Sequence, residues 1–153
     1  VGMMQIHPNS RNVIPGRVFL TVDFRHPNAD ILKAMNDELE IEVKKIVDKI
    51  GLEMEFEQIW YSPPVAFDKD CVNAVRKAAE QAGYAHRDIV SGAGHDACYI
   101  NKVAPTGMVF IPCENGISHN EEENATPDDI TAGCQVLLQA VIERANSVGT
   151  STE

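Results

Sequence analysis

The sequence predicts an α/β chain in two parts, and two observations carry this prediction. Up to residue 61 the expected elements follow the order strand, strand, helix, strand. From Asp68 onward, helical patterns alternate with short apolar segments, which is typical of a mainly parallel sheet. Ser62-Pro63-Pro64 interrupts both patterns. We therefore predict two domains at 1–62 and 63–146, followed by a tail at 147–153.

Three strands are expected in the first part. Residues 1–6 form the first, 18–25 the second and 53–60 the third. In the second strand apolar residues occupy every other position, so one face of the sheet is dry and the other is largely polar.

One long helix separates the second strand from the third. Asn28 caps it, its apolar residues form a single stripe, and Gly51 ends it. We expect this stripe to lie on the dry face of the sheet. The order of elements is that of a β-α-β-β-α-β ferredoxin-like unit without its first strand and helix. Part of the apolar face would then be open, so the sequence has the pattern of a fragment.

In the second part, helices are expected at 68–82, at 96–103 and from residue 127, with strands at 89–90 and 107–112. The last helix has a clear start signal, because Thr126 can act as N-cap and Asp129 takes the place of the usual Glu of a capping box. We expect its inner face to consist of the apolar residues of one stripe: Ile130, Cys134, Leu137, Leu138, Val141 and Ala145.

Composition excludes several classes of partner. With 13 basic and 23 acidic residues the net charge is −10, so neither nucleic acid nor an anionic membrane surface is an expected partner. No apolar run is long enough to span a bilayer, no signal-peptide pattern occurs, and the four cysteines lie in apolar segments without CxxC pairing. We expect a cytoplasmic protein, although the sequence leaves open whether a targeting segment lies upstream of Val1.

Two loops carry residues of the types that bind ligands or metal ions. The "GISHNEEE" loop places His119 among acidic side chains after the expected 107–112 strand, and the "SGAGHDA" loop at 91–97 is rich in glycine. Open α/β sheets bind their ligands at the carboxyl ends of strands, where both loops are expected. The alternative for the first is a solvated acidic loop, because a single histidine is weak evidence for a metal.

These two motifs, together with "PNSRNVIPGRVFLTVDFRH" upstream, resemble motifs of the metal-dependent amidohydrolases. That family includes N-carbamoyl-L-amino-acid hydrolase, allantoate amidohydrolase and β-ureidopropionase, and is related to the aminoacylases and dizinc exopeptidases. The resemblance implies an incomplete ferredoxin-like lid, through which two copies form a homodimer. It also implies that the C-terminal part of an α/β dizinc-hydrolase catalytic domain follows the lid.

The resemblance further implies two divalent metal ions, zinc or alternatively manganese or nickel, which hold a bridging water while a glutamate accepts its proton. His119 would be a ligand of one metal. Neither a His-x-Asp motif nor a Glu-Glu pair occurs at the positions that this chemistry needs, so we assign no catalytic residue. We therefore expect this chain to be inactive alone, with its remaining ligands upstream of Val1.

For substrate binding, the resemblance implies that Asn12 and Arg25 hold the carboxylate of an N-carbamoyl amino acid or of allantoate. Gly92 and Gly94 would let backbone N–H groups approach the substrate. The alternatives are an ion pair of Arg25 with Asp23, a turn role for Asn12 and a tight turn at the glycines.

His95 and Asp96 belong to the same glycine-rich motif, and their role is open. They are either functional, or structural with His95 buried and hydrogen-bonded and Asp96 capping the next helix.

Two functions follow from the sequence. The first is a metal-dependent hydrolase of C–N bonds in linear amides that bear a carboxylate. The alternative is a non-catalytic module for substrate binding and dimerisation. The residues do not distinguish the exact substrate, the metal or the stereochemical preference.

Overall fold

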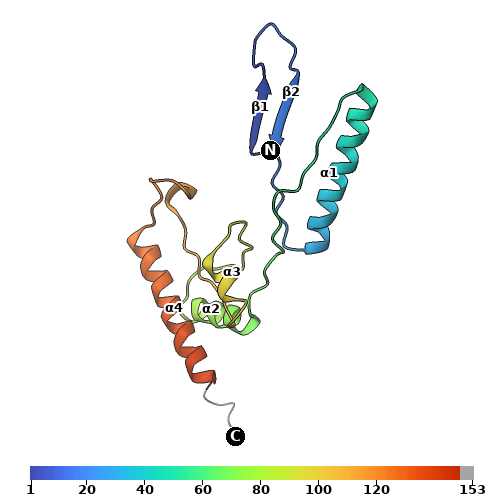
Figure 1. Ribbon diagram of the computed structural model, residues 1–153. Coiled ribbons are helices and arrows are strands. Elements are labelled where there is room, and N and C mark those ends of the chain that lie inside the picture. The colour runs from blue at the N-terminus through green and yellow to red at the C-terminus, as the bar shows by residue number, and fades with distance from the viewer. Residues whose placement is uncertain (149–153) are drawn as a thin grey trace. The chain divides into compact units, whose positions relative to one another are not determined.

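A computed structural model describes residues 1–148 of the chain. It is of mixed helix and strand, and it divides into two compact units, Val1–Pro64 and a second that begins at Val65. Figure 1 shows the elements of both units. No helix within the described residues is long and apolar enough to cross a membrane.

The first unit begins with an antiparallel hairpin of β1 (Met3–His7) and β2 (Arg17–Thr21). Met3 pairs with Thr21 and His7 with Arg17, and the N–H of Gly16 donates to the carbonyl of His7 at 2.9 Å to close the loop. The first two predicted strands are thus present, but the second ends earlier than expected.

The third predicted strand is absent, because residues 53–60 show no strand pairing in the described structure. An apolar alternation gives a strand only where a neighbouring strand takes up its backbone N–H and C=O groups. Within the described residues the sheet has two strands, so no such neighbour is available.

The long helix α1 (Ala29–Ile50) has the boundaries that the sequence predicts. The Asn28 side chain accepts from the N–H groups of Asp30 and Ile31 at 2.9 and 3.0 Å, and Gly51 has a φ of 74°. However, no residue of α1 is buried, and among the described residues it packs on neither strand. The expectation that α1 covers the dry face is therefore wrong here, because a two-stranded hairpin offers little area to cover.

The core of the second unit lies between α2 (Lys69–Gln81) and α4 (Pro127–Val148). Small side chains let the two helices approach closely, since the core residues are at most 6% exposed: Ala74, Ala78, Ala79, Val136 and Ala140. Polar contacts flank it, with the Tyr84 hydroxyl donating to Gln135 Oε1 at 2.7 Å and Lys77 Nζ 3.3 Å from Glu143 Oε1.

The start of α4 confirms the predicted cap. The N–H of Asp129 donates to Thr126 Oγ1 at 3.1 Å, and the Thr126 hydroxyl donates to Asp129 Oδ2 at 2.6 Å. At its other end α4 includes Ser147, so the predicted tail begins inside this helix. Residues 149–153 of that tail lie outside the described residues.

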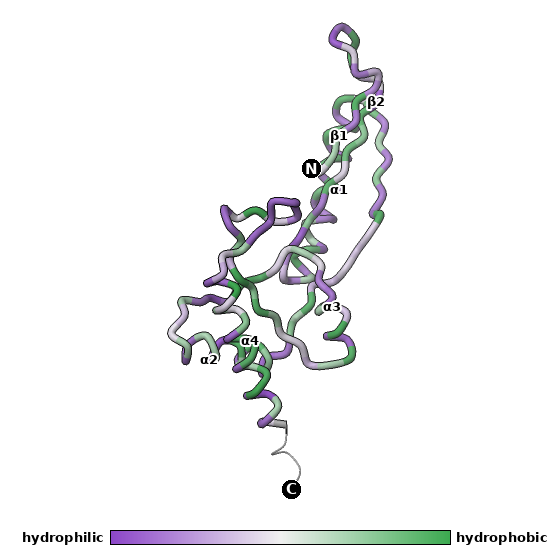
Figure 2. Tube along the Cα trace, turned by 90° about the vertical axis from the view of Figure 1, so that its left-hand side faces the viewer, coloured by the Kyte–Doolittle hydropathy of each residue, from purple (hydrophilic) through white to green (hydrophobic). Residues whose placement is uncertain are grey.

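The predicted inner face of α4 is wrong. Leu137, Leu138 and Val141 are 53%, 57% and 57% exposed, whereas Val136 and Ala140 are buried. Close approach to the alanines of α2 selects the small residues of α4, which leaves the large apolar stripe on the other side. In Figure 2 hydrophobic residues, in green, recur along α4.

The two strands predicted in the second unit are also absent. Residues 89–90 and 107–112 are irregular, and the described part of this unit contains no sheet. A strand needs a neighbouring strand to take up its backbone N–H and C=O groups, and these segments have none within the described residues. The helix expected at 96–103 is α3 (Asp96–Ile100), followed by a turn.

Candidate functional site

The His119 loop, residues 113–124, lies between the irregular 107–112 segment and α4, in orange in Figure 1. The N–H of Glu114 donates to the carbonyl of Asn124 at 2.7 Å, so the ends of the loop are joined. The short 3-10 helix η1 (Glu114–Gly116) starts it. The loop is thus closed by its own hydrogen bonds and projects an exposed histidine.

His119 itself makes two local contacts. Its backbone N–H donates to Glu123 Oε2 at 2.8 Å, and its Nδ1 lies 3.1 Å from Ser118 Oγ. An exposed neutral imidazole can offer a nitrogen to zinc. However, the described residues contain no group of three or more His, Cys, Asp or Glu that could hold a metal ion. The loop therefore offers one imidazole that fits a metal ion, and one such group does not make a metal site by itself.

The glycine-rich loop at 91–97 is fixed by Ser91 and His95. Ser91 Oγ lies 2.7 Å from His95 Nε2 and accepts the N–H of Ala93 at 3.2 Å. The half-buried His95 ring also packs edge-on against Phe110, with 5.5 Å between ring centroids. Because Phe110 belongs to the 107–112 segment, this contact connects the glycine loop to the chain that leads into the His119 loop.

The structure answers part of the open question on His95 and Asp96. His95 is hydrogen-bonded, as its structural alternative expects, but it is half-buried and not buried, and it occupies the N-cap position of α3 without a side-chain cap bond. Asp96 is the first residue of α3, so it does not cap the helix.

Asn12 and Arg25 lie in the first unit, and both are exposed. The Ser10 hydroxyl donates to Asn12 Oδ1 at 2.7 Å. Arg25 donates to both oxygens of Asp23, from Nε at 3.1 Å and from Nη2 at 2.7 Å, so the ion pair weighed as the alternative is present. Through the same hydrogen bonds the pKa of Asp23 is lowered and that of Arg25 is raised. The pair keeps both groups charged.

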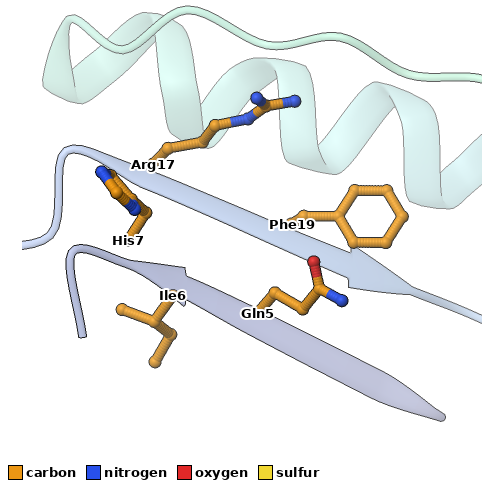
Figure 3. Close-up of a pocket in the computed structure, with 5 residues that line it drawn as sticks. All are labelled: Gln5, Ile6, His7, Arg17 and Phe19. Carbon is orange, nitrogen blue, oxygen red and sulfur yellow. The ribbon is translucent and has the colours of Figure 1, made fainter.

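A hollow of about 550 Å³ lies on the hairpin, and Figure 3 shows its lining. Gln5, Ile6 and His7 come from β1, and Arg17 and Phe19 from β2. All of the lining residues are exposed, and none belongs to the predicted site. Because this hollow is an open concavity on a thin hairpin, we do not assign it to the site.

The sequence does not single out Ser91 as a partner of His95. By resemblance the acidic run at 121–123 is expected to include groups around a metal held by His119, but the sequence does not predict that Glu123 contacts the His119 backbone. The available signal is spacing, since Ser91 lies four residues before His95, and Glu123 four residues after His119. Such spacing allows a contact across a tight loop but does not require one.

Comparison with known proteins finds a matching family model and several similar proteins. The family model described as peptidase family M20/M25/M40 matches residues 7–143. The N-carbamoyl-L-amino-acid amidohydrolase of Rhizobium meliloti is 47% identical over 148 residues, which cover 97% of this chain and 36% of that protein. The allantoate amidohydrolase of Escherichia coli (strain K12) is 34% identical over 144 residues, which cover 94% of this chain and 35% of that protein.

A solved structure is also similar. The crystal structure of an amidase of the hydantoinase/carbamoylase family from Burkholderia multivorans matches with a TM-score of 0.92 and 65% identity, covering 94% of this chain and 35% of that one. The chain thus spans about 35% of the length of these relatives.

Proposed function

The chain belongs to peptidase family M20/M25/M40, and we propose that it is the C-terminal part of a metal-dependent hydrolase of C–N bonds in linear amides. The resemblance drawn from the sequence motifs is thereby confirmed at the level of the family. The observation that carries the proposal is the similarity, over nearly the whole chain, to proteins named as amidohydrolases.

The substrate that we propose is an amide with a carboxylate, of the N-carbamoyl-L-amino acid or allantoate type. Arg25 would bind the carboxylate with its planar fork, and Asn12 would add an amide donor. The ion pair with Asp23 is compatible with this role, because it is exposed and orients the guanidinium. An exposed pair of this kind is also easily rearranged by a competing carboxylate.

Gly94 supports a close approach of the substrate to the loop. Its φ is not in the left-handed region, and an added Cβ would meet no atom within 4 Å. Neither the backbone nor packing within the described residues therefore explains a glycine at this position. We assign Gly92 and Gly94 to the substrate site, where the lack of side chains leaves room for a ligand next to the backbone.

Among the described residues, the proposed metal role rests on His119 alone. The complete enzyme would hold two divalent ions, zinc or alternatively manganese or nickel. His119 fits as one ligand, but the described residues lack a complete set. The other ligands and the proton-accepting glutamate would come from further polypeptide, so we assign no catalytic residue here.

The first unit is proposed to be part of a ferredoxin-like lid that pairs with a second copy in a cytoplasmic homodimer, with domain limits at 1–62 and 63–146. Its hairpin exposes apolar residues on both strands: Met3, Met4, Ile6, Val18, Phe19 and Leu20. Apolar side chains on so thin a sheet are expected to be covered in the complete protein.

A second candidate is a non-catalytic module for substrate binding and dimerisation. The exposed apolar side chains of the hairpin favour it, because such side chains are expected to be covered by another surface. The two functions predict different results in an assay of the complete polypeptide that carries this chain.

The assay measures hydrolysis of N-carbamoyl-L-amino acids and of allantoate, with zinc, manganese or nickel added, before and after chelation. We expect turnover by the complete enzyme that a chelator abolishes and added metal restores. The 153-residue chain alone should show none. A complete polypeptide that binds these compounds without hydrolysing any of them would favour the non-catalytic module instead.

A further inference from the structure

Three residues of the His119 loop have a left-handed backbone. The φ angles are 56° for Asn115, 69° for Gly116 and 57° for His119. Glycine adopts this region freely, whereas a histidine does so uncommonly and remains there only where surrounding contacts hold it. A contact must therefore hold the backbone of His119.

Glu123 provides this contact. Its Oε2 accepts the backbone N–H of His119 at 2.8 Å, and its Oε1 lies 3.9 Å from Cys113 Sγ, a weak thiol donor. The N–H of Glu123 in turn donates to the carbonyl of Asn120 at 3.0 Å. One carboxylate therefore joins the start of the loop, its histidine and its end.

The two neighbouring glutamates do not share this geometry. Within the described structure, the side chains of Glu121 and Glu122 make no hydrogen bond or ion pair, and only the backbone N–H of Glu122 bonds to Asn120 Oδ1, at 2.9 Å. All three carboxylates are exposed and carry the same charge. Glu123 thus differs from its neighbours in its contacts.

We infer that Glu123 is the positioning residue of His119, whose backbone it holds so that the imidazole keeps one orientation. This inference rests on the proposed role of His119 as a metal ligand. Groups that orient a metal ligand typically contribute a factor of about 10–100 to metal affinity. The neighbouring carboxylates should contribute no such factor.

The test uses the complete enzyme and three variants: Glu123→Ala, Glu123→Gln and the matched control Glu122→Ala. The first readout is the zinc affinity, measured by competition with a chelator. The second is backbone hydrogen exchange of the 113–124 loop in the metal-free protein, which needs neither metal nor activity.

We expect Glu123→Ala to lower the zinc affinity by about 10–100-fold and to speed exchange at His119. Glu123→Gln keeps a carbonyl oxygen that can accept the same N–H, so it should retain most of the affinity and the protection. Glu122→Ala should change neither readout.

Two other outcomes separate this inference from the proposed function. If Glu123→Ala speeds exchange at His119 but leaves zinc affinity unchanged, Glu123 holds the backbone without positioning a metal ligand, and the inference is overturned. The proposed metal role fails only if His119→Ala also leaves the zinc affinity unchanged. If exchange at His119 is the same in Glu123→Ala as in Glu122→Ala, Glu123 does not hold the loop. The inference is then overturned whatever the zinc affinity.

Discussion

Replacing Gly133 by alanine tests the packing that supports the His119 loop. Gly133 lies inside α4, and an added Cβ would be 2.5 Å from Ile111 Cγ2. Carbon atoms pack best at about 3.5–4.0 Å, and a β-branched side chain cannot easily rotate away. Ile111 would therefore have to shift, and it belongs to the segment that leads into the loop.

The expected magnitude follows from two opposing terms. Overpacking a close contact costs about 1–3 kcal/mol, whereas alanine is favoured over glycine inside a helix by about 1 kcal/mol. Gly133→Ala should therefore lower the free energy of unfolding by about 0–2 kcal/mol. In an Ile111→Ala background Cγ2 is gone, and the same substitution should raise it by about 1 kcal/mol.

The assay is a double-mutant cycle by urea unfolding of the 153-residue chain, with the two single variants and the double variant. The expected coupling between the two positions is about 1–3 kcal/mol, which is the overpacking term alone. If Gly133→Ala has the same effect in both backgrounds, Ile111 does not face Gly133 and the account of this contact is refuted.

Three further predictions concern the substrate site and the start of α2. Arg25→Ala should lower kcat/KM of the complete enzyme about tenfold to more than a hundredfold on a carboxylate substrate, with only part recovered by Arg25→Lys. An equal loss on an amide without a carboxylate would instead make Arg25 only a partner of Asp23. Gly94→Ala should raise KM and leave the thermal midpoint unchanged, because the added Cβ meets no atom within 4 Å; a lower midpoint would show that folding needs this glycine. The pKa of Asp68 is lowered, mainly by the N–H of Cys71, so its stabilising effect is present above the ordinary value of 3.8 and is lost as the pH falls through the lower folded value. The stability advantage of the wild type over Asp68→Asn should therefore shrink below about pH 4, and an advantage that does not change with pH would contradict this reading.

Helices could be predicted from the sequence because their signals are local. Asn28, Asp68 and Thr126 each accept backbone N–H groups at the start of the expected helix, and Gly51 follows the end of α1 with a positive φ. A capping side chain acts within one turn, so its effect does not depend on the rest of the protein.

Strands and inner faces could not be predicted in the same way. The patterns at 53–60 and 107–112 are typical of strands, but pairing partners are absent from the described part of the chain. In α4 the sequence favours the large residues such as Leu137 for the core, whereas contact with α2 buries Val136 and Ala140. Both depend on which surfaces meet, and residue patterns alone do not specify that.

The motifs predict which loops carry the candidate site, but they do not predict the internal geometry of those loops. The motifs identified the loops around His95 and His119, and the family is confirmed by comparison. The hydrogen bond between Ser91 and His95 and the one from the His119 N–H to Glu123 arise from loop conformations, including a left-handed histidine, that the sequence does not predict.

The most direct test of the central claim is the metal content of the complete enzyme with His119→Ala, measured together with its activity and its thermal midpoint without metal. The account predicts loss of bound metal and of activity, with an unchanged midpoint, because His119 is exposed on a loop and adds little to packing. Full metal occupancy with normal activity in this variant would contradict the account and leave His119 as a solvated loop histidine.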